Sequence, residues 1–305
     1  MKRVGALFVA VLAASAGAAP ASRMRVAADC SKTSVGLVPL TDLKIGRYQG
    51  FQGGLYARGR NSPSRRYLKL GLTKARLVKP IGGRIVLLSI GMSNTTMEFS
   101  AFKQLADRDP RKNPRVTIVD GAQGGWDADR IADPSASFWS GVDTRLAAAG
   151  ATARQVQAVW LKEAIAGENE PFPADARHLR TDLRAIVGIL GRRYANLRVV
   201  YLSSRTYAGY ATTPLNPEPY AYQSGFAVKW TIQDRLAGRL KGPWLGWGPY
   251  LWTDGTKGRS DGLVWTCADV GADGTHPSAS GAQKVADLLL RFFAGSRTAK
   301  SWFVR

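Results

Sequence analysis

Five short apolar runs separated by helix-forming stretches constrain the fold more than any other feature of the sequence. Strands are predicted at these runs, which occupy residues 84–90, 115–119, 156–161, 198–202 and 243–248. Helices are predicted most clearly at 174–193 and 279–294, where apolar side chains recur every three or four residues. Successive strand–helix units build a parallel sheet with right-handed crossovers and helices on both faces. We therefore expect an α/β fold with a five-stranded parallel sheet.

Polar and aromatic residues follow the predicted strands, at the edge where such sheets bind ligands. Ser93 comes after the first strand and begins a predicted helix, and a glycine block at 120–125 follows the second. Arg205 follows the fourth strand. Trp247 ends the fifth, with Tyr250 close behind. A functional site is expected along this edge.

Two histidines make the search for a general base short. His178 lies within the predicted 174–193 helix on its polar side, so it is interpreted as solvated. His276 follows Asp273 by three residues, a spacing that lets the carboxylate orient the imidazole while its other nitrogen accepts a proton. His276 would then activate the hydroxyl of Ser93. The structural alternatives are an Asp-Gly turn before a capped helix, and a serine that only caps its own helix.

Together these motifs resemble the SGNH, or GDSL-like, hydrolase superfamily over residues 81–298. The resemblance implies a flavodoxin-like three-layer α/β/α sandwich with Ser93 as nucleophile, His276 as base and Asp273 as its orienting acid. It also implies an oxyanion hole formed by backbone N–H groups of Ser93 and of Gly124 or Gly125. Members of this superfamily include esterases, lipases, carbohydrate deacetylases and acyltransferases.

The chain departs from the superfamily pattern at two places. Met92 replaces the aspartate of the usual Gly-Asp-Ser motif. The asparagine expected after the third strand is absent, and Lys162 and Glu163 stand there instead. Either side chain is a candidate for the pocket wall, and Asn169 is a candidate replacement if its loop folds back. One missing oxyanion donor costs about 10²–10³ in turnover.

Three residues after the later strands are candidate substrate contacts. Trp247 and Tyr250 offer aromatic faces that suit a sugar ring, although large aromatic residues also commonly fill cores. Arg205 is a candidate partner for a carbonyl or carboxylate. The expected substrate is a small ester or an acylated glycan.

The N-terminus has the pattern of an export signal. Lys2 and Arg3 precede an apolar run at 4–14 and then small residues, so residues 1–21 are predicted to be a cleaved signal peptide of a secreted or periplasmic protein. An uncleaved tether is the alternative. The rest of the chain has no apolar run long enough to span a bilayer.

Residues 22–80 are rich in glycine, arginine, serine and tyrosine without a sustained period, so they are predicted to form an extended arm packed on the main domain, 81–305. In an exported protein, Cys30 and Cys267 are expected to form a disulfide. Two unrelated buried thiols are the alternative.

The charge of the chain favours acidic partners. Its 43 lysine and arginine residues exceed its 22 aspartate and glutamate residues, which gives a net charge of +21. Such a charge attracts anionic material such as an envelope polymer, but no nucleic-acid-binding motif is present. No metal site or cofactor is predicted. We expect a secreted serine esterase or deacetylase, with a glycan-binding module or an O-acyltransferase as alternatives.

Overall fold

The computed structural model describes Met1, residues 27–167 and residues 170–305. The signal peptide predicted at residues 1–21 therefore lies outside the described residues, apart from Met1. Across the described ranges, no helix combines the length and apolar character needed to cross a membrane.

A five-stranded, all-parallel sheet forms the centre of the molecule, in the order β4-β3-β5-β6-β7. Counted along the chain within this sheet, the order is 2-1-3-4-5, which is that of a flavodoxin-like fold. The predicted α/β class and five strands are confirmed. The strands are β3 (Ile85–Gly91), β4 (Val116–Asp120), β5 (Val156–Lys162), β6 (Val199–Leu202) and β7 (Trp244–Trp247).

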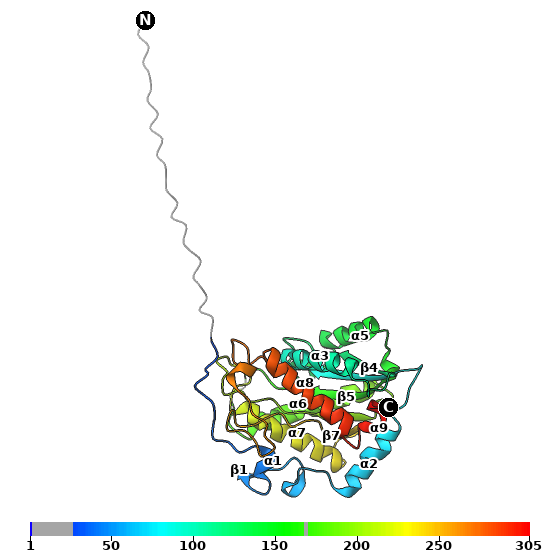
Figure 1. Cartoon of the computed structure of the whole chain (residues 1–305), viewed down its shortest axis with the longest axis horizontal. Coiled ribbons are helices and arrows are strands. Elements are labelled where there is room, and N and C mark those ends of the chain that lie inside the picture. The colour runs from blue at the N-terminus through cyan, green and yellow to red at the C-terminus, as the bar shows by residue number, and fades with distance from the viewer. Residues whose placement is uncertain (2–26, 168–169) are drawn as a thin grey trace.

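Helices cover both faces of this sheet (Figure 1). On one face α3 packs against α8, and on the other α6 packs against α7. The helices fall on different faces because the chain steps one way from β3 to β4 and the opposite way from β4 onward, while every crossover is right-handed. The helices predicted at 174–193 and 279–294 are confirmed as α6 and α8. The main helices are α3 (Ser93–Arg108), α5 (Ser137–Ala148), α6 (Ala174–Arg193), α7 (Tyr220–Leu236) and α8 (Ala279–Gly295).

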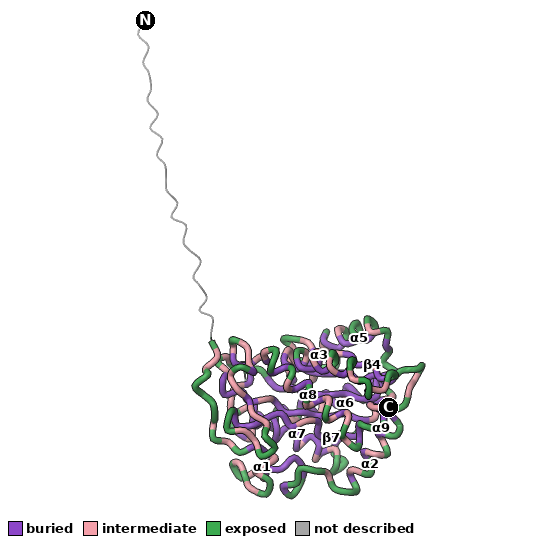
Figure 2. Tube along the Cα trace, viewed as in Figure 1, coloured by how far each residue is buried: buried purple, intermediate pink, exposed green. Residues whose placement is uncertain are grey.

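The central strands β3 and β5 are buried at every residue, and Figure 2 shows buried residues concentrated between the helical layers. Burial on both faces explains why these strands are continuously apolar rather than alternating. The short elements are α1 (Leu40–Leu43), β1 (Arg47–Tyr48), β2 (Phe51–Gln52), α4 (Ala128–Ile131), α9 (Lys300–Phe303) and the 3-10 turns η1 (Ala57–Gly59), η2 (Ala153–Gln155) and η3 (Cys267–Asp269).

The N-terminal segment covers the β7 edge of the sheet. It contains α2 (Arg65–Arg76), a helix that the predicted extended arm did not include. The Tyr67 hydroxyl donates to the carbonyl of Leu245 in β7 at 2.9 Å, and Gly71 lies directly against the ring of Trp244. Covering an edge strand in this way protects its unpaired backbone groups from other chains.

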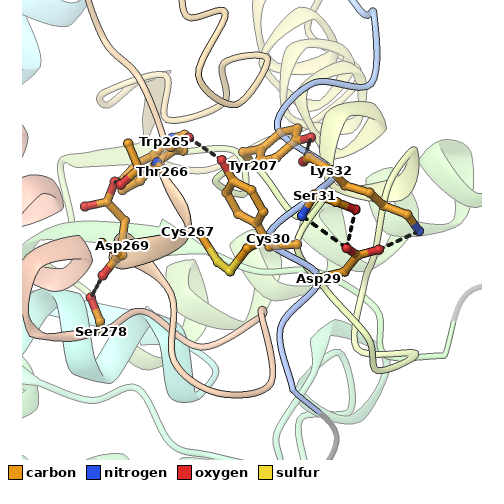
Figure 3. Close-up of a disulfide and its surroundings, with 12 residues drawn as sticks. Asp29, Cys30, Ser31, Lys32, Tyr207, Trp265, Thr266, Cys267, Asp269 and Ser278 are labelled. Carbon is orange, nitrogen blue, oxygen red and sulfur yellow. Dashed lines mark hydrogen bonds and ion pairs between the residues drawn. A yellow bond between two sulfur atoms is a disulfide. The ribbon is translucent and has the colours of Figure 1, made fainter.

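Cys30 and Cys267 form a disulfide, as predicted (Figure 3). Their Cα atoms lie 5.4 Å apart although 237 positions separate them in the sequence. The bond joins the start of the described N-terminal segment to η3. Asp269 in η3 accepts a backbone hydrogen bond from Ser278 at 3.0 Å, so the disulfide is tied to the residues that lead into α8.

Candidate active site

Ser93 stands at the turn between β3 and α3. The strand ends at Gly91, Met92 is the extended N-cap, and Ser93 is the first helical residue. Gly91 has no space for a side chain because the carbonyl of Lys162 and the side chain of Thr95 lie directly against it. Since the first N–H groups of a helix have no acceptor inside the helix, the Ser93 N–H has no partner within α3.

A tight turn at Asp273 holds His276 in place. One carboxylate oxygen of Asp273, Oδ1, accepts from the backbone N–H groups of Thr275 and His276, both at 3.0 Å. The other, Oδ2, lies 2.5 Å from Nδ1 of His276. Gly274 has a φ of +66°, a left-handed conformation that favours glycine. The Asp-Gly turn interpretation is therefore correct, and it coexists with the carboxylate–imidazole contact.

The electrostatics of this turn decide which imidazole nitrogen carries the proton. Burial raises the pKa of Asp273, but the hydrogen bonds from the His276 side chain and the two backbone N–H groups outweigh burial and hold the pKa below its usual value. Asp273 is therefore an ionised acceptor. The proton lies on Nδ1 of His276, and Nε2 is left to accept a hydrogen bond.

Ser93 and His276 meet across the edge of the sheet. The Oγ of Ser93 lies 2.7 Å from Nε2 of His276, although 183 positions separate them. Asn94 braces the contact because its Nδ2 donates to the carbonyl of Thr275 at 2.7 Å. The side chains of His276 and Asp273 are 31% and 30% exposed, which leaves them accessible to a small molecule. A hydroxyl, an imidazole and a carboxylate thus form a continuous line of hydrogen bonds.

The glycine block after β4 runs beside Ser93. Gln123 anchors it through a 2.9 Å backbone hydrogen bond to Gly91. A side-chain carbon built on Gly124 would lie 3.6 Å from Cβ of Ser93, whereas Gly125 has a φ of +78° and lines the adjacent pocket. Within the described ranges, the N–H groups of Ser93 and Gly124 donate to no protein acceptor. Two backbone donors therefore remain beside the Ser93 hydroxyl.

A pocket of about 410 Å³ opens next to Ser93 and His276. Arg205, one of the predicted substrate contacts, lines it and is only 2% exposed. Sequence reasoning missed several other wall residues, because nothing in their spacing marks them. These are Met92, Asn94, Asp127, Arg130, Ile165, Ala166, Leu215, Asn216 and Thr275.

Trp247 and Tyr250 do not reach this pocket. They are 6% and 4% exposed and belong to the core. The Trp247 indole N–H donates to the carbonyl of Leu55 at 2.8 Å, and the Tyr250 hydroxyl accepts from the backbone N–H of Leu40 at 3.1 Å. Both side chains hold the N-terminal segment against the sheet. The structural alternative, ordinary aromatic core, is the correct one here.

The end of β5 also differs from expectation. Lys162 and Glu163 are each 1% exposed, and neither lines the pocket. The Nζ of Lys162 lies 2.6 Å from both carboxylate oxygens of Glu98, and burial raises the pKa of Glu163 well above its usual value. Ile165 lines the pocket instead. Asn169, the candidate replacement donor, lies outside the described residues.

Comparison with known proteins gives matches to structures only. No family model matches the chain, and no curated protein matches it. An acetylxylan esterase from Geobacillus stearothermophilus, crystallised as a catalytic mutant, is similar at 16% identity and a TM-score of 0.42, over 74% of this chain and 99% of that one. An alpha/beta hydrolase from the metagenome of Lake Arreo, Spain, is similar at 13% identity and a TM-score of 0.40, over 73% of this chain and 98% of that one.

A salicylyl-acyltransferase from a tetracycline biosynthetic pathway is similar at 16% identity and a TM-score of 0.40, over 73% of this chain and 56% of that one. At such identities and TM-scores these likenesses transfer no activity to this chain. Its resemblance to the SGNH hydrolases therefore rests on the motifs, the strand order and the geometry around Ser93.

The second histidine belongs to a separate group. His178 is on the exposed side of α6, as predicted, but its Nε2 lies 2.8 Å from Oδ1 of Asp129 and 3.8 Å from Oδ2 of Asp182. One ligand atom from each of these three residues lies within 4.8 Å of the other two, a grouping that the sequence analysis did not foresee. Sequence spacing hides this group because Asp129 and His178 are on different helices.

Proposed function

We propose that this protein is a secreted serine esterase or deacetylase that hydrolyses a carboxylic ester through an acyl-enzyme on Ser93. The observation that carries the proposal is the continuous hydrogen-bonded line from Ser93 through His276 to Asp273 at the edge of a pocket. A serine hydroxyl is a weak nucleophile until an adjacent base accepts its proton, and this geometry supplies that base.

The reaction follows from the two distances at His276. As Oγ of Ser93 attacks the ester carbonyl carbon, its proton passes to Nε2 of His276, 2.7 Å away. Asp273 stabilises the imidazolium through Nδ1. The imidazolium then gives its proton to the departing alcohol oxygen as the carbon–oxygen bond breaks. Water attacks the acyl-enzyme by the same route, which releases the acid and restores the serine.

The negative charge that develops on the carbonyl oxygen needs donors. The backbone N–H groups of Ser93 and Gly124 are the proposed donors, because Gly124 lies against Ser93 and neither N–H is used elsewhere in the described part of the chain. Gly124 is favoured over Gly125 by its closer approach to Ser93.

The pocket volume suits a small ester. Its wall combines apolar side chains, Ile165 and Leu215, with the cationic Arg205. An acylated glycan remains within the proposal, but it has no support from Trp247 and Tyr250, which are core residues.

The test is hydrolysis of p-nitrophenyl acetate by the purified protein and by Ser93→Ala. We expect turnover to fall by about 10⁴-fold or more, because the covalent step is removed. The matched control is Ser140→Ala, which removes an exposed hydroxyl on α5 and is expected to keep full activity. Circular dichroism establishes that all three proteins fold. Equal rates in the parent and Ser93→Ala would rule out the acyl-enzyme.

A further inference from the structure

A cluster of three potential metal ligands lies between α4 and α6. Asp129 comes from α4, while His178 and Asp182 are one turn apart on the same side of α6. One ligand atom from each, an imidazole nitrogen or a carboxylate oxygen, lies within 4.8 Å of the other two. The cluster is independent of the proposed esterase chemistry.

A buried carboxylate oxygen of Asp182 lies next to the other two potential ligands. Asp182 is 7% exposed, and among the described residues its Oδ2 has no hydrogen-bond partner. That oxygen lies on the side of His178, whose Nε2 is 3.8 Å away. A nine-tenths buried carboxylate oxygen is thus aimed at a second carboxylate and an imidazole.

The spacing of the three atoms is close to that of a coordination shell. Ligands about 2.1 Å from a tetrahedral zinc ion lie about 3.4 Å from one another. The observed separations from Nε2 of His178, 2.8 Å to Asp129 and 3.8 Å to Asp182, lie on either side of this value. Small side-chain rotations are enough to equalise them, because Asp129 and His178 are 45% and 49% exposed.

We propose that Asp129, His178 and Asp182 bind one divalent transition-metal ion of the zinc class. One imidazole nitrogen with two carboxylate oxygens is a zinc-type donor set, whereas calcium and magnesium prefer oxygen ligands alone. Three protein ligands leave at least one position for water. The half-exposed ligands allow the ion to enter from, and return to, solvent.

The bound ion would fasten the pocket wall. Asp127 and Arg130 line the pocket, and Asp129 lies between them on the same turn. Asp127 already accepts from the backbone N–H of Ala166 at 3.0 Å. A cation held by both α4 and α6 adds a connection from this wall to α6, beside the hydrogen bond that ties it to Ala166.

The proposal is tested by isothermal titration of the chelator-treated full chain with zinc chloride, with thermal unfolding as a second readout. We expect one zinc ion per chain and a higher unfolding temperature with zinc. Asp182→Asn and His178→Gln each remove a coordinating group, so each is expected to weaken binding by at least the roughly 10–100-fold that loss of an outer-shell partner alone costs. Magnesium chloride gives no such shift.

Two comparisons keep the test decisive. His276→Gln removes the other histidine and Asp287→Asn removes an exposed carboxylate on α8, and both are expected to bind zinc like the parent. In chelator, Asp182→Asn unfolds near the parental temperature, because Oδ2 of Asp182 accepts no hydrogen bond among the described residues that the variant could lose, yet the variant loses the zinc-dependent shift. Unchanged zinc affinity in both cluster variants, loss of binding in His276→Gln, or no binding at millimolar zinc would overturn the proposal.

Discussion

Replacing Glu98 by leucine will destabilise the fold and make its stability more sensitive to acid. Glu98 and Lys162 join α3, which begins with Ser93, to the end of β5 through two 2.6 Å contacts, and each side chain is 1% exposed. Burial lowers the pKa of Lys162 to about 8, although Glu98 opposes the shift. Glu98→Leu removes the larger of the two carboxyl groups' effects that oppose burial, and leaves only that of Glu163, so Lys162 is expected to fold in its neutral form.

The cost follows from that protonation change. Holding a group of pKa about 8 neutral at pH 7 costs roughly 1–2 kcal/mol, and leaving its buried donors unpaired adds about 1–3 kcal/mol. We expect a total loss of about 2–5 kcal/mol at pH 7. Below pH 8 Lys162 is protonated in the folded parent but neutral in the folded variant, so the folded variant binds one proton fewer. The difference in free energy of unfolding between the two therefore grows by about 1.4 kcal/mol for each unit that the pH falls. Above pH 8 only the hydrogen-bond cost remains.

The measurement is urea unfolding of parent and variant at pH 6, 7 and 9. The double variant Glu98→Leu/Lys162→Met is the control, because it removes both charges and keeps apolar volume in the core. It is expected to be near the parent in stability, since replacing a complete buried pair costs far less than breaking it. A difference between Glu98→Leu and the parent that is the same at pH 6 and pH 9 would refute the reasoning.

Two further predictions concern the N-terminal segment. The double variant Cys30→Ser/Cys267→Ser loses about 2–5 kcal/mol in urea unfolding, because the disulfide closes a loop of 237 residues, and an unchanged midpoint would contradict this. Lys229 donates to the carbonyls of Gln52 and Gly53, and burial lowers its pKa to about 8. Between pH 8 and 10 the unfolded chain therefore binds more protons than the folded one, so the free energy of unfolding of the parent rises with pH by about 2 kcal/mol relative to that of Lys229→Met. Urea unfolding across this range measures the difference, and an equal pH dependence in the two proteins would exclude the pKa shift.

The spacing of apolar residues is enough to predict the five strands, with ends within one residue, because buried parallel strands are continuous apolar runs. It also predicts α6 and α8, each of which buries one broad stripe. Both kinds of element are recognisable locally, since their burial pattern follows directly from their own geometry.

Two helices left no such pattern. Twelve of the 17 residues of α7 are buried, so buried residues occur around most of the helix. No exposed polar face is left to make an apolar stripe recognisable in the sequence. In α2 only Tyr67, Gly71 and Ala75 are buried, a line of mostly small residues one turn apart. The absence of a side chain at Gly71 matters because the Trp244 ring occupies the space where one would lie, and that contact depends on the tertiary fold.

The same limit explains which site residues were predictable. Local turn chemistry marks Ser93, Asp273 and His276, because a strand-to-helix serine and an Asp-Gly turn are visible in the sequence itself. The group of Asp129, His178 and Asp182 depends instead on how α4 packs on α6. No spacing along one helix reveals a ligand that comes from another.

Trp247 and Tyr250 follow a strand end but do not contact the pocket, so the rule about strand ends did not hold for them. The rule places ligands at the carboxyl ends of the strands, but most strongly where the strand order reverses. Here the reversal lies between β3 and β5, and residues after β3, β4 and β5 line the pocket. β7 is the strand at the far edge, and the N-terminal segment packs over it. Trp247 and Tyr250 therefore pack against this covering segment. Arg205 after β6 and His276, which follows β7 by a longer connection, still line the pocket, so a place after a strand end does not by itself decide which residues form the site.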